Sequence, residues 1–88
     1  MVSENILVVD DDKNMLEVLN LRLVAEGYHV TATALASEAL HLANEQVFDL
    51  ALIDLKLTGN EDGIDLMEKV HQVAPETVSY THLRAHET

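Results

Sequence analysis

The 88-residue sequence predicts one α/β domain in which a parallel sheet carries helices on both faces. Short, β-branched apolar runs alternate along the chain with longer segments whose apolar residues recur at helical spacing. The connections between these segments are short, and no internal repeat or linker is visible. Alternation of this kind is typical of parallel strands joined by right-handed helical crossovers. We therefore expect the chemistry of the domain at one edge of a sheet.

The first two predicted elements are a strand at residues 6–9 and a helix at residues 13–26. The strand is a continuous apolar run, which is typical of a parallel strand buried on both faces. Asp12 predicts the N-cap of the helix, and Gly27 predicts the left-handed residue that follows its end. The helix carries an apolar stripe that consists of Leu16, Leu19 and Leu23.

The remaining predicted elements continue the alternation: a strand at 28–34, a helix at 36–45, a strand at 48–53, and a helix from Gly63 or Ile64 to Val73. The helix at 36–45 has a small-residue face, and Pro75 ends the helix that reaches Val73. The strand at 48–53 is apolar until it ends at Asp54. A charged side chain in that position has to be solvated or have a function, because the apolar residues before it in the strand are buried.

The composition restricts the classes of function. The formal net charge is −11, with 16 acidic residues against 5 Lys and Arg. This charge opposes direct binding to nucleic acid or to anionic lipid, and it favours divalent cations or basic partner surfaces. The absence of cysteine excludes disulfides and thiolate metal sites. No signal peptide or membrane-spanning run is visible, so we expect a cytoplasmic protein.

Three acidic residues follow the ends of two predicted strands. Asp10 and Asp11 follow the first strand, and Asp54 follows the third. Binding sites of open parallel α/β sheets lie beyond the carboxyl ends of the strands, so neighbouring strands would bring these carboxylates into one crevice. Clustered carboxylates repel one another unless a cation lies among them, and Mg²⁺ prefers oxygen ligands. The bland alternative is an acidic surface loop, which fits the Asp10–Asp12 run better than it fits Asp54.

Three segments of the sequence resemble the receiver domains of bacterial two-component response regulators. These segments are ILVVDDD, FDLALIDLKL and DGIDLMEKV, and the resemblance runs from about Glu4 to Thr77. It implies a flavodoxin-like three-layer fold with strand order 2-1-3, and a non-enzymatic phosphoacceptor module. It also implies that Asp54 receives a phosphoryl group from a sensor histidine kinase.

The resemblance further implies a magnesium site and a downstream partner. Asp11 and Asp54 would bind Mg²⁺ directly, Asp10 would act through a water molecule, and Lys56 would contribute its backbone carbonyl. The DGIDLMEKVHQVAPET segment is similar to receivers of enhancer-binding transcription activators, so the resemblance implies an output domain outside this chain. The negative net charge argues against direct binding to nucleic acid or membranes by the receiver itself.

The last eleven residues do not follow the family pattern. Receiver domains continue with a fourth, strongly apolar strand that ends in Ser or Thr, and a fifth strand that ends in Lys. Residues 78–88 contain no four-residue apolar run, and no residue there matches that Lys. We therefore expect a partial receiver domain at 1–77 and a non-native tail at 78–88. The strand at 48–53 would then be an open edge, and the 88-residue chain would be marginally stable or prone to aggregation.

Two other functions remain open at this point. A receiver-like interaction module could keep the fold without being phosphorylated. A haloacid-dehalogenase-type phosphatase also places two acids in an Asp-x-Asp pattern after its first strand, and Asp10 and Asp12 have that spacing. The phosphatase reading leaves Asp54 without a role.

Overall fold

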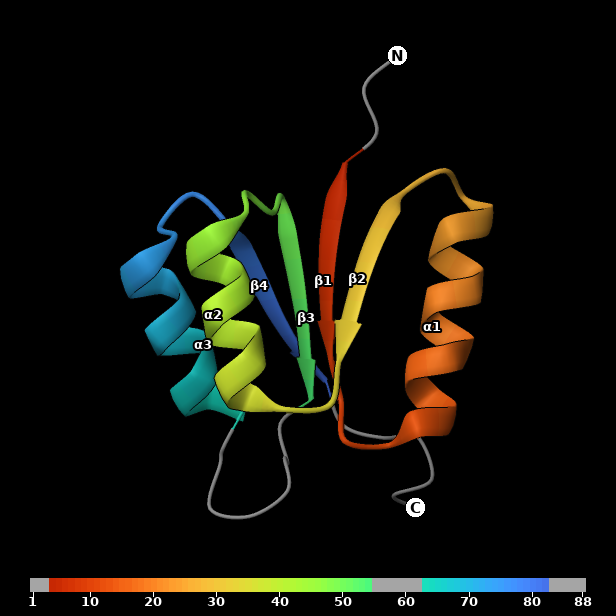
Figure 1. The fold of residues 1–88 in the computed structure, drawn as a ribbon, viewed down its shortest axis with the longest axis horizontal. Helices are drawn as coiled ribbons and strands as arrows, with labels where there is room; N and C mark the ends of the chain where they lie inside the picture. The colour runs from red at the N-terminus through yellow and green to blue at the C-terminus, as the bar shows by residue number, and fades with distance from the viewer. Residues whose placement is uncertain (1–3, 55–62, 83–88) are drawn as a thin grey trace.

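The computed structural model describes residues 4–54 and 63–82, which form a four-stranded parallel sheet and three helices (Figure 1). Strands and helices alternate along the chain in the predicted way. Their bounds are β1 Asn5–Val9, α1 Lys13–Ala25, β2 His29–Thr33, α2 Ala36–Glu45, β3 Leu50–Asp54, α3 Gly63–Val73 and β4 Val78–His82. None of the helices in the described ranges is long and apolar enough to cross a membrane.

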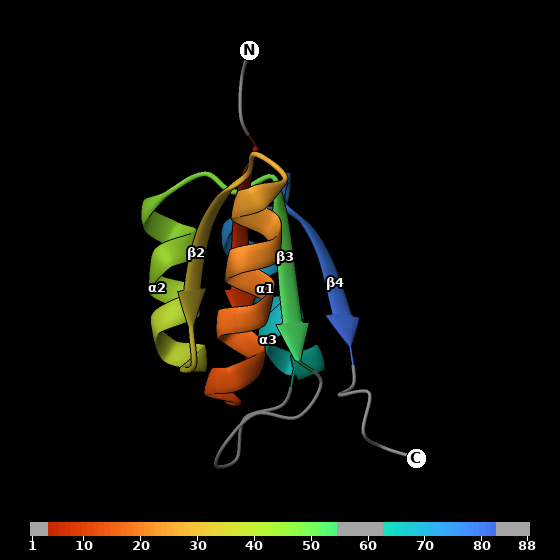
Figure 2. The same cartoon turned by 90° about the vertical axis from the view of Figure 1, so that its right-hand side faces the viewer.

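The sheet has the order β2-β1-β3-β4, and every neighbouring pair of strands is parallel. Four of the five residues of β1 are buried, because this strand lies inside the sheet and is covered on both faces. Figures 1 and 2 show α1 on one face of the sheet, and α2 and α3 together on the other. The predicted three-layer fold and the predicted order 2-1-3 are confirmed.

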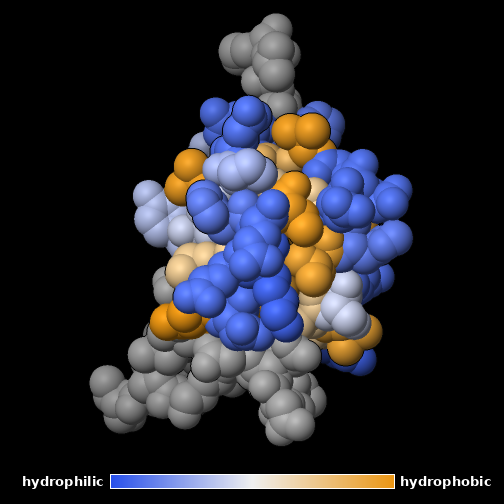
Figure 3. All heavy atoms as spheres, turned by 90° about the vertical axis from the view of Figure 1, so that its left-hand side faces the viewer, coloured by the Kyte–Doolittle hydropathy of each residue, from blue (hydrophilic) through white to orange (hydrophobic). Residues whose placement is uncertain are grey.

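The main hydrophobic core lies between the sheet and the pair α2 and α3. Alternate residues of β1 and β3 point to this side and meet the small-residue face of α2 and two buried residues of α3. The buried residues of this core are Leu7, Val9, Ala36, Ala39, Ala43, Phe48, Ala51, Ile53, Leu66 and Val70. Hydrophilic side chains cover much of the outer surface of α2 and α3 (Figure 3), as expected for helices whose inner faces pack on a sheet.

The opposite face of the sheet is covered less completely. The helix α1 is the described helix on this side, and it has no buried residue. Its predicted stripe of Leu16, Leu19 and Leu23 is half-buried, while Val18 and Leu21 are exposed. The two faces of the sheet therefore differ in how much apolar surface they remove from water.

The ends of α1 agree with the sequence analysis. The Asp12 carboxylate accepts hydrogen bonds from the backbone N–H groups of Asn14 and Met15, at 2.9 and 3.3 Å, which confirms the predicted N-cap. Gly27 has a φ of 101°, in the left-handed region that the prediction required.

The strand β4 is the main difference from the sequence analysis. The expectation that residues 48–53 form an open edge is wrong, because β3 pairs with β4 along Leu50–Asp54. The prediction required a continuous apolar run, which is the pattern of a central strand. β4, the outermost strand among the described residues, needs fewer apolar residues, and Val78 and Tyr80 are residue types that favour strands. Whether residues 78–88 belong to the native domain stays a prediction.

Candidate metal centre

Three carboxylates meet where β1 and β3 end. The register of these strands pairs Val9 with Ile53, so Asp10 and Asp54 occupy equivalent positions at the carboxyl edge of the sheet. Asp10 and Asp54 are buried, with 0% and 1% of their surface exposed, and Asp11 is partly buried. One oxygen of each of the three side chains lies within 4.8 Å of the others. The structure thus brings together the acids that the sequence analysis selected.

Hydrogen bonds hold Asp10 in a defined position. Its backbone N–H donates to the carbonyl oxygen of Thr33, at 3.2 Å, which extends the pairing of β1 with β2 by one residue. Its Oδ1 atom accepts a hydrogen bond from the backbone N–H of Asp12, at 2.9 Å. Because the second bond forms an Asx-type turn, it bends the chain away from the sheet directly after the acidic pair.

Thr33 supports this edge of the sheet and was not singled out by the sequence analysis. It is 4% exposed, and its hydroxyl donates to the Glu38 carboxylate while accepting from the backbone N–H of Leu35. These bonds fix the turn between β2 and α2 beside Asp10. The available signal was position, since Thr33 ends a strand that neighbours β1.

Asp12 lies next to the cluster in sequence but has a different role. Its Oδ1 atom caps α1 through the two hydrogen bonds described above. Among residues 4–54 and 63–82, the group of acids close enough to share a metal ion consists of Asp10, Asp11 and Asp54, without Asp12. The Asp-x-Asp pattern required by the phosphatase reading is therefore divided between a buried cluster and a helix cap.

The cluster has the chemistry of a site for a hard divalent cation. Carboxylate oxygens are the ligands preferred by Mg²⁺ and Ca²⁺, and one or two carboxylates commonly hold Mg²⁺. Three carboxylates within 4.8 Å repel one another, and the low exposure of Asp10 and Asp54 weakens the screening by solvent. A cation in this position would offset the repulsion, so the residues present fit a metal ion. The fourth predicted ligand, Lys56, lies outside the described residues.

Comparison with curated proteins finds relatives among bacterial regulators. The chain is 37% identical over 71 residues to the transcriptional regulatory protein GlrR of Escherichia coli strain K12, covering 81% of this chain and 16% of that protein. It is 34% identical over 70 residues to sporulation initiation phosphotransferase F of Bacillus subtilis strain 168, covering 80% of this chain and 56% of that protein. The chain thus spans about a sixth of the length of GlrR and just over half of the phosphotransferase.

Comparison with solved structures also finds response regulators. A CheY-like response regulator receiver domain protein from Methanospirillum hungatei JF-1 superposes with a TM-score of 0.88 at 35% identity, over 93% of this chain and 65% of that one. A response regulator from Burkholderia pseudomallei, solved with a phosphorylated aspartic acid, a calcium ion and citrate, gives a TM-score of 0.85 at 30% identity. That match covers 92% of this chain and 47% of the other. Residues 6–87 also match the family model of the response regulator receiver domain.

Proposed function

This chain belongs to the response regulator receiver domain family, and we propose that its Asp54 accepts a phosphoryl group from a histidine kinase. The observation that carries the proposal is the position of Asp54, which is 1% exposed and lies within 4.8 Å of two other carboxylates at the carboxyl edge of the sheet. Burial of a carboxylate at the end of an apolar strand costs free energy, and a role as the reacting group would account for a carboxylate in this position.

The three clustered acids and one backbone carbonyl would hold the proposed metal ion. Asp11 and Asp54 would bind Mg²⁺ directly, Asp10 would act through a water molecule, and Lys56 would contribute its backbone carbonyl. When bound, Mg²⁺ supplies positive charge that offsets the charge of the carboxylates and of an incoming phosphoryl group. The hydrogen bond from the backbone N–H of Asp12 keeps the Asp10 carboxylate turned into the site.

The proposed reaction is an in-line phosphoryl transfer with Asp54 as the nucleophile. An oxygen of the Asp54 carboxylate forms a bond to phosphorus while the bond between phosphorus and the imidazole nitrogen of the kinase breaks. The electron pair of the broken bond remains on that nitrogen. The other ring nitrogen of the phosphohistidine carries a proton, so the leaving imidazole is neutral, and the products are an acyl phosphate on Asp54 and a neutral histidine on the kinase.

Two of the similar proteins support the proposal. The response regulator from Burkholderia pseudomallei was solved with a phosphorylated aspartic acid and a calcium ion, and this chain shares its fold at 30% identity. The name of the Bacillus subtilis relative, a phosphotransferase, also describes phosphoryl transfer. By extension from relatives named as transcriptional regulators, we propose an output domain as the downstream partner.

Labelling with a small phosphodonor tests the proposal without the cognate kinase. The chain is incubated with acetyl phosphate and Mg²⁺, and intact mass spectrometry is expected to show addition of one phosphoryl group. Hydroxylamine should remove the label, since it cleaves acyl phosphates.

Two variants make the test specific to Asp54. Asp54→Asn should abolish labelling, whereas Asp65→Asn should leave it unchanged, because Asp65 is exposed and pairs with Lys69 on α3. An unlabelled wild-type chain would favour the non-phosphorylated interaction module. Steady release of phosphate from small phosphate esters would favour the phosphatase reading.

A further inference from the structure

We propose that Thr33 is a positioning residue of the metal centre: its hydroxyl, held by Glu38, orients the backbone carbonyl that binds the Asp10 amide, and this sets the affinity of the acidic cluster for Mg²⁺. The proposal rests on the proposed function in one respect, which is that the cluster binds Mg²⁺. Thr33 ends β2 and Glu38 lies in the first turn of α2, so the link joins two elements that carry none of the clustered acids.

Thr33 connects β2 to the strand that leads into the cluster. The register pairs it with Val9, the last residue of β1. Its backbone carbonyl accepts a hydrogen bond from the N–H of Asp10, at 3.2 Å, one residue beyond the paired strands. Because an Asp side chain is short, its carboxylate follows the position of its backbone. The Thr33 carbonyl therefore helps to place the Asp10 carboxylate, which is fully buried.

The direction of this carbonyl depends on the Thr33 side chain. The Thr33 Oγ1 atom accepts a hydrogen bond from the backbone N–H of Leu35, at 3.2 Å. This bond closes a turn of the Ser/Thr type over Ala34. Since the peptide group between Thr33 and Ala34 is planar, the closed turn fixes the direction of the Thr33 carbonyl. Without the hydroxyl, the carbonyl loses this restraint.

Glu38 holds the hydroxyl in the orientation that the turn needs. The Thr33 hydroxyl donates its proton to the Glu38 carboxylate, so its lone pairs remain available to the N–H of Leu35. Leu35 is the N-cap residue of α2 and has no side-chain acceptor. In a capping box, an acid three residues after the N-cap accepts from the N-cap backbone N–H directly. Here the Thr33 hydroxyl bridges the two groups.

Asp10 makes a matching turn at the end of the neighbouring strand. Its Oδ1 atom accepts a hydrogen bond from the N–H of Asp12, two residues further on, at 2.9 Å. The hydrogen bond from the Asp10 N–H to the Thr33 carbonyl joins the two turns. Asp10 is thus held by its own carboxylate on one side and by Thr33 on the other. Groups that orient metal ligands in this way commonly change metal affinity by about 10- to 100-fold when they are removed.

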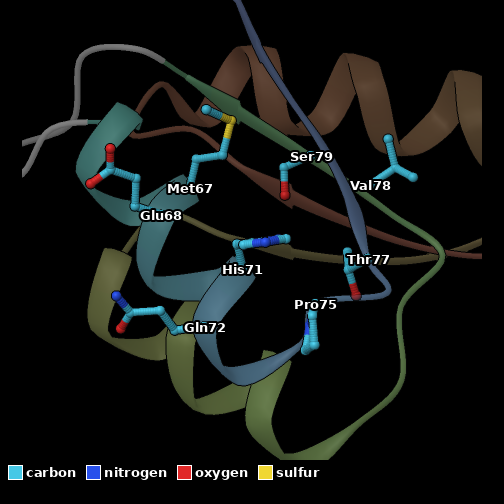
Figure 4. Close-up of a pocket in the computed structure, with 8 residues that line it drawn as sticks. All are labelled: Met67, Glu68, His71, Gln72, Pro75, Thr77, Val78 and Ser79. Atoms are coloured by element: carbon cyan, nitrogen blue, oxygen red, sulfur yellow. The ribbon is translucent and has the colours of Figure 1, made fainter.

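Thr77 offers a matched comparison for Thr33. Both residues are buried, with 6% and 4% of their surface exposed, and both donate a hydroxyl hydrogen bond to an oxygen of another element or its flank. Thr77 lies next to the start of β4, near Pro75 (Figure 4), and bonds the backbone carbonyl of Phe48. Phe48 precedes β3, whereas the metal centre lies where β3 ends. The same substitution at Thr77 therefore removes a buried hydrogen bond away from the acids.

The affinity for Mg²⁺ tests the proposal, measured on the folded 88-residue chain by NMR titration without a phosphodonor. Thr33→Val should weaken binding by about tenfold, the low end of the range for groups that orient a ligand. Thr33→Ser keeps the hydroxyl and should restore the wild-type affinity. Thr77→Val should also keep it, even though it lowers stability, because the dissociation constant is measured on folded molecules.

Two variants of Glu38 isolate the hydrogen bond from the charge. Glu38→Gln and Glu38→Leu remove the same negative charge, but the amide oxygen of Gln can still accept from Thr33. Glu38→Leu should therefore bind Mg²⁺ more weakly than Glu38→Gln, and less weakly than Thr33→Val, which also loses the bond from Leu35. Glu38 is exposed, so this pair keeps the test decisive if Thr33→Val fails to fold.

The Asp10 amide reports the route of the effect without a metal ion. Its proton should exchange with solvent faster in Thr33→Val than in Thr77→Val, because only the first variant loosens the carbonyl that binds it. Equal exchange would overturn the proposal, as would Mg²⁺ affinities that are unchanged in Thr33→Val or equally lowered in Thr77→Val. A wild-type chain that binds no Mg²⁺ would overturn both this proposal and the metal site. Failure to label Asp54 with Mg²⁺ binding intact would overturn the phosphoacceptor role alone.

Discussion

Asp54 is a residue whose proposed function requires a position that costs folding free energy. It ends β3, it is 1% exposed, and it shares its surroundings with Asp10 and Asp11. Repulsion among three carboxylates opposes folding in the absence of a cation. A cation that binds the folded state and not the unfolded chain stabilises the protein by an amount that grows with the logarithm of its concentration once that exceeds the dissociation constant.

We predict opposite effects of Asp54→Asn with and without Mg²⁺. Without Mg²⁺, the variant should be more stable than the wild type by about 1–2 kcal/mol, because one charge leaves the cluster. At about 100 times its dissociation constant, Mg²⁺ should stabilise the wild type by about 2.7 kcal/mol. It should stabilise the variant much less, and urea unfolding followed by circular dichroism measures both differences.

The control for this prediction is Asp65→Asn. Asp65 is 53% exposed and its carboxylate lies 3.1 Å from the Lys69 amine, so its removal should change stability by less than about 1 kcal/mol at either Mg²⁺ concentration. An equal response of wild type and Asp54→Asn to Mg²⁺ would remove Asp54 from the metal site.

For single residues, the sequence predicted which acids form the cluster and at which edge of the sheet they lie, but not the hydrogen bonds that position them. Asp10, Asp11 and Asp54 could be selected because each follows a strand end. The position of Thr33 at a strand end was visible, but its contribution depends on hydrogen bonds from Asp10 and Leu35 that a sequence does not reveal. Asp12 was predicted as a cap because its pattern is local.

Among the elements, those defined by local patterns were predicted best. The helix α2 has the predicted bounds, and α3 begins at one of the two predicted residues and ends at the predicted one. The strand β4 was missed, because its five residues do not form a continuous apolar run. Its place is set by tertiary contacts with β3 and by the turn after α3, neither of which is visible in local periodicity.

Thr77 provides one of the contacts that place β4. Its hydroxyl donates to the backbone carbonyl of Phe48, at 2.7 Å, and both residues are buried. The next residue, Val78, then donates its N–H to Asp49. The side chain of Thr77 therefore fixes the start of β4 beside the start of β3.

We predict that Thr77→Val destabilises the protein by about 1–3 kcal/mol, because it has nearly the same shape and removes a buried hydrogen-bond donor. The Val78 amide should also exchange faster with solvent. Urea unfolding and hydrogen exchange measure the two effects. Thr31→Val is the control, since Thr31 is half-buried in β2 and its side chain has no hydrogen bond among the described residues. A similar loss in both variants would contradict the anchoring role.

For the whole molecule, the decisive feature is the difference between the two faces of the sheet. One face meets the buried core shared with α2 and α3, and the other meets α1, which has no buried residue. Small domains have little surplus stability, so incomplete cover of one face matters. The expected marginal stability of the 88-residue chain stays a prediction, although the open edge at β3 that motivated it is not present, because β3 pairs with β4.

The uneven cover leads to a prediction about where the molecule opens first. Local opening requires less free energy where few apolar contacts are broken, so α1 should open more easily than the core around β1. Native-state hydrogen exchange should give amides of α1 opening free energies lower than those of Leu7 and Val9 by at least about 1 kcal/mol. Amides of α2 should resemble β1, because Ala39 and Ala43 are buried against the same core. Equal protection of α1 and β1 would show that α1 is held as firmly as the core, and the difference between the two faces would then have no energetic consequence.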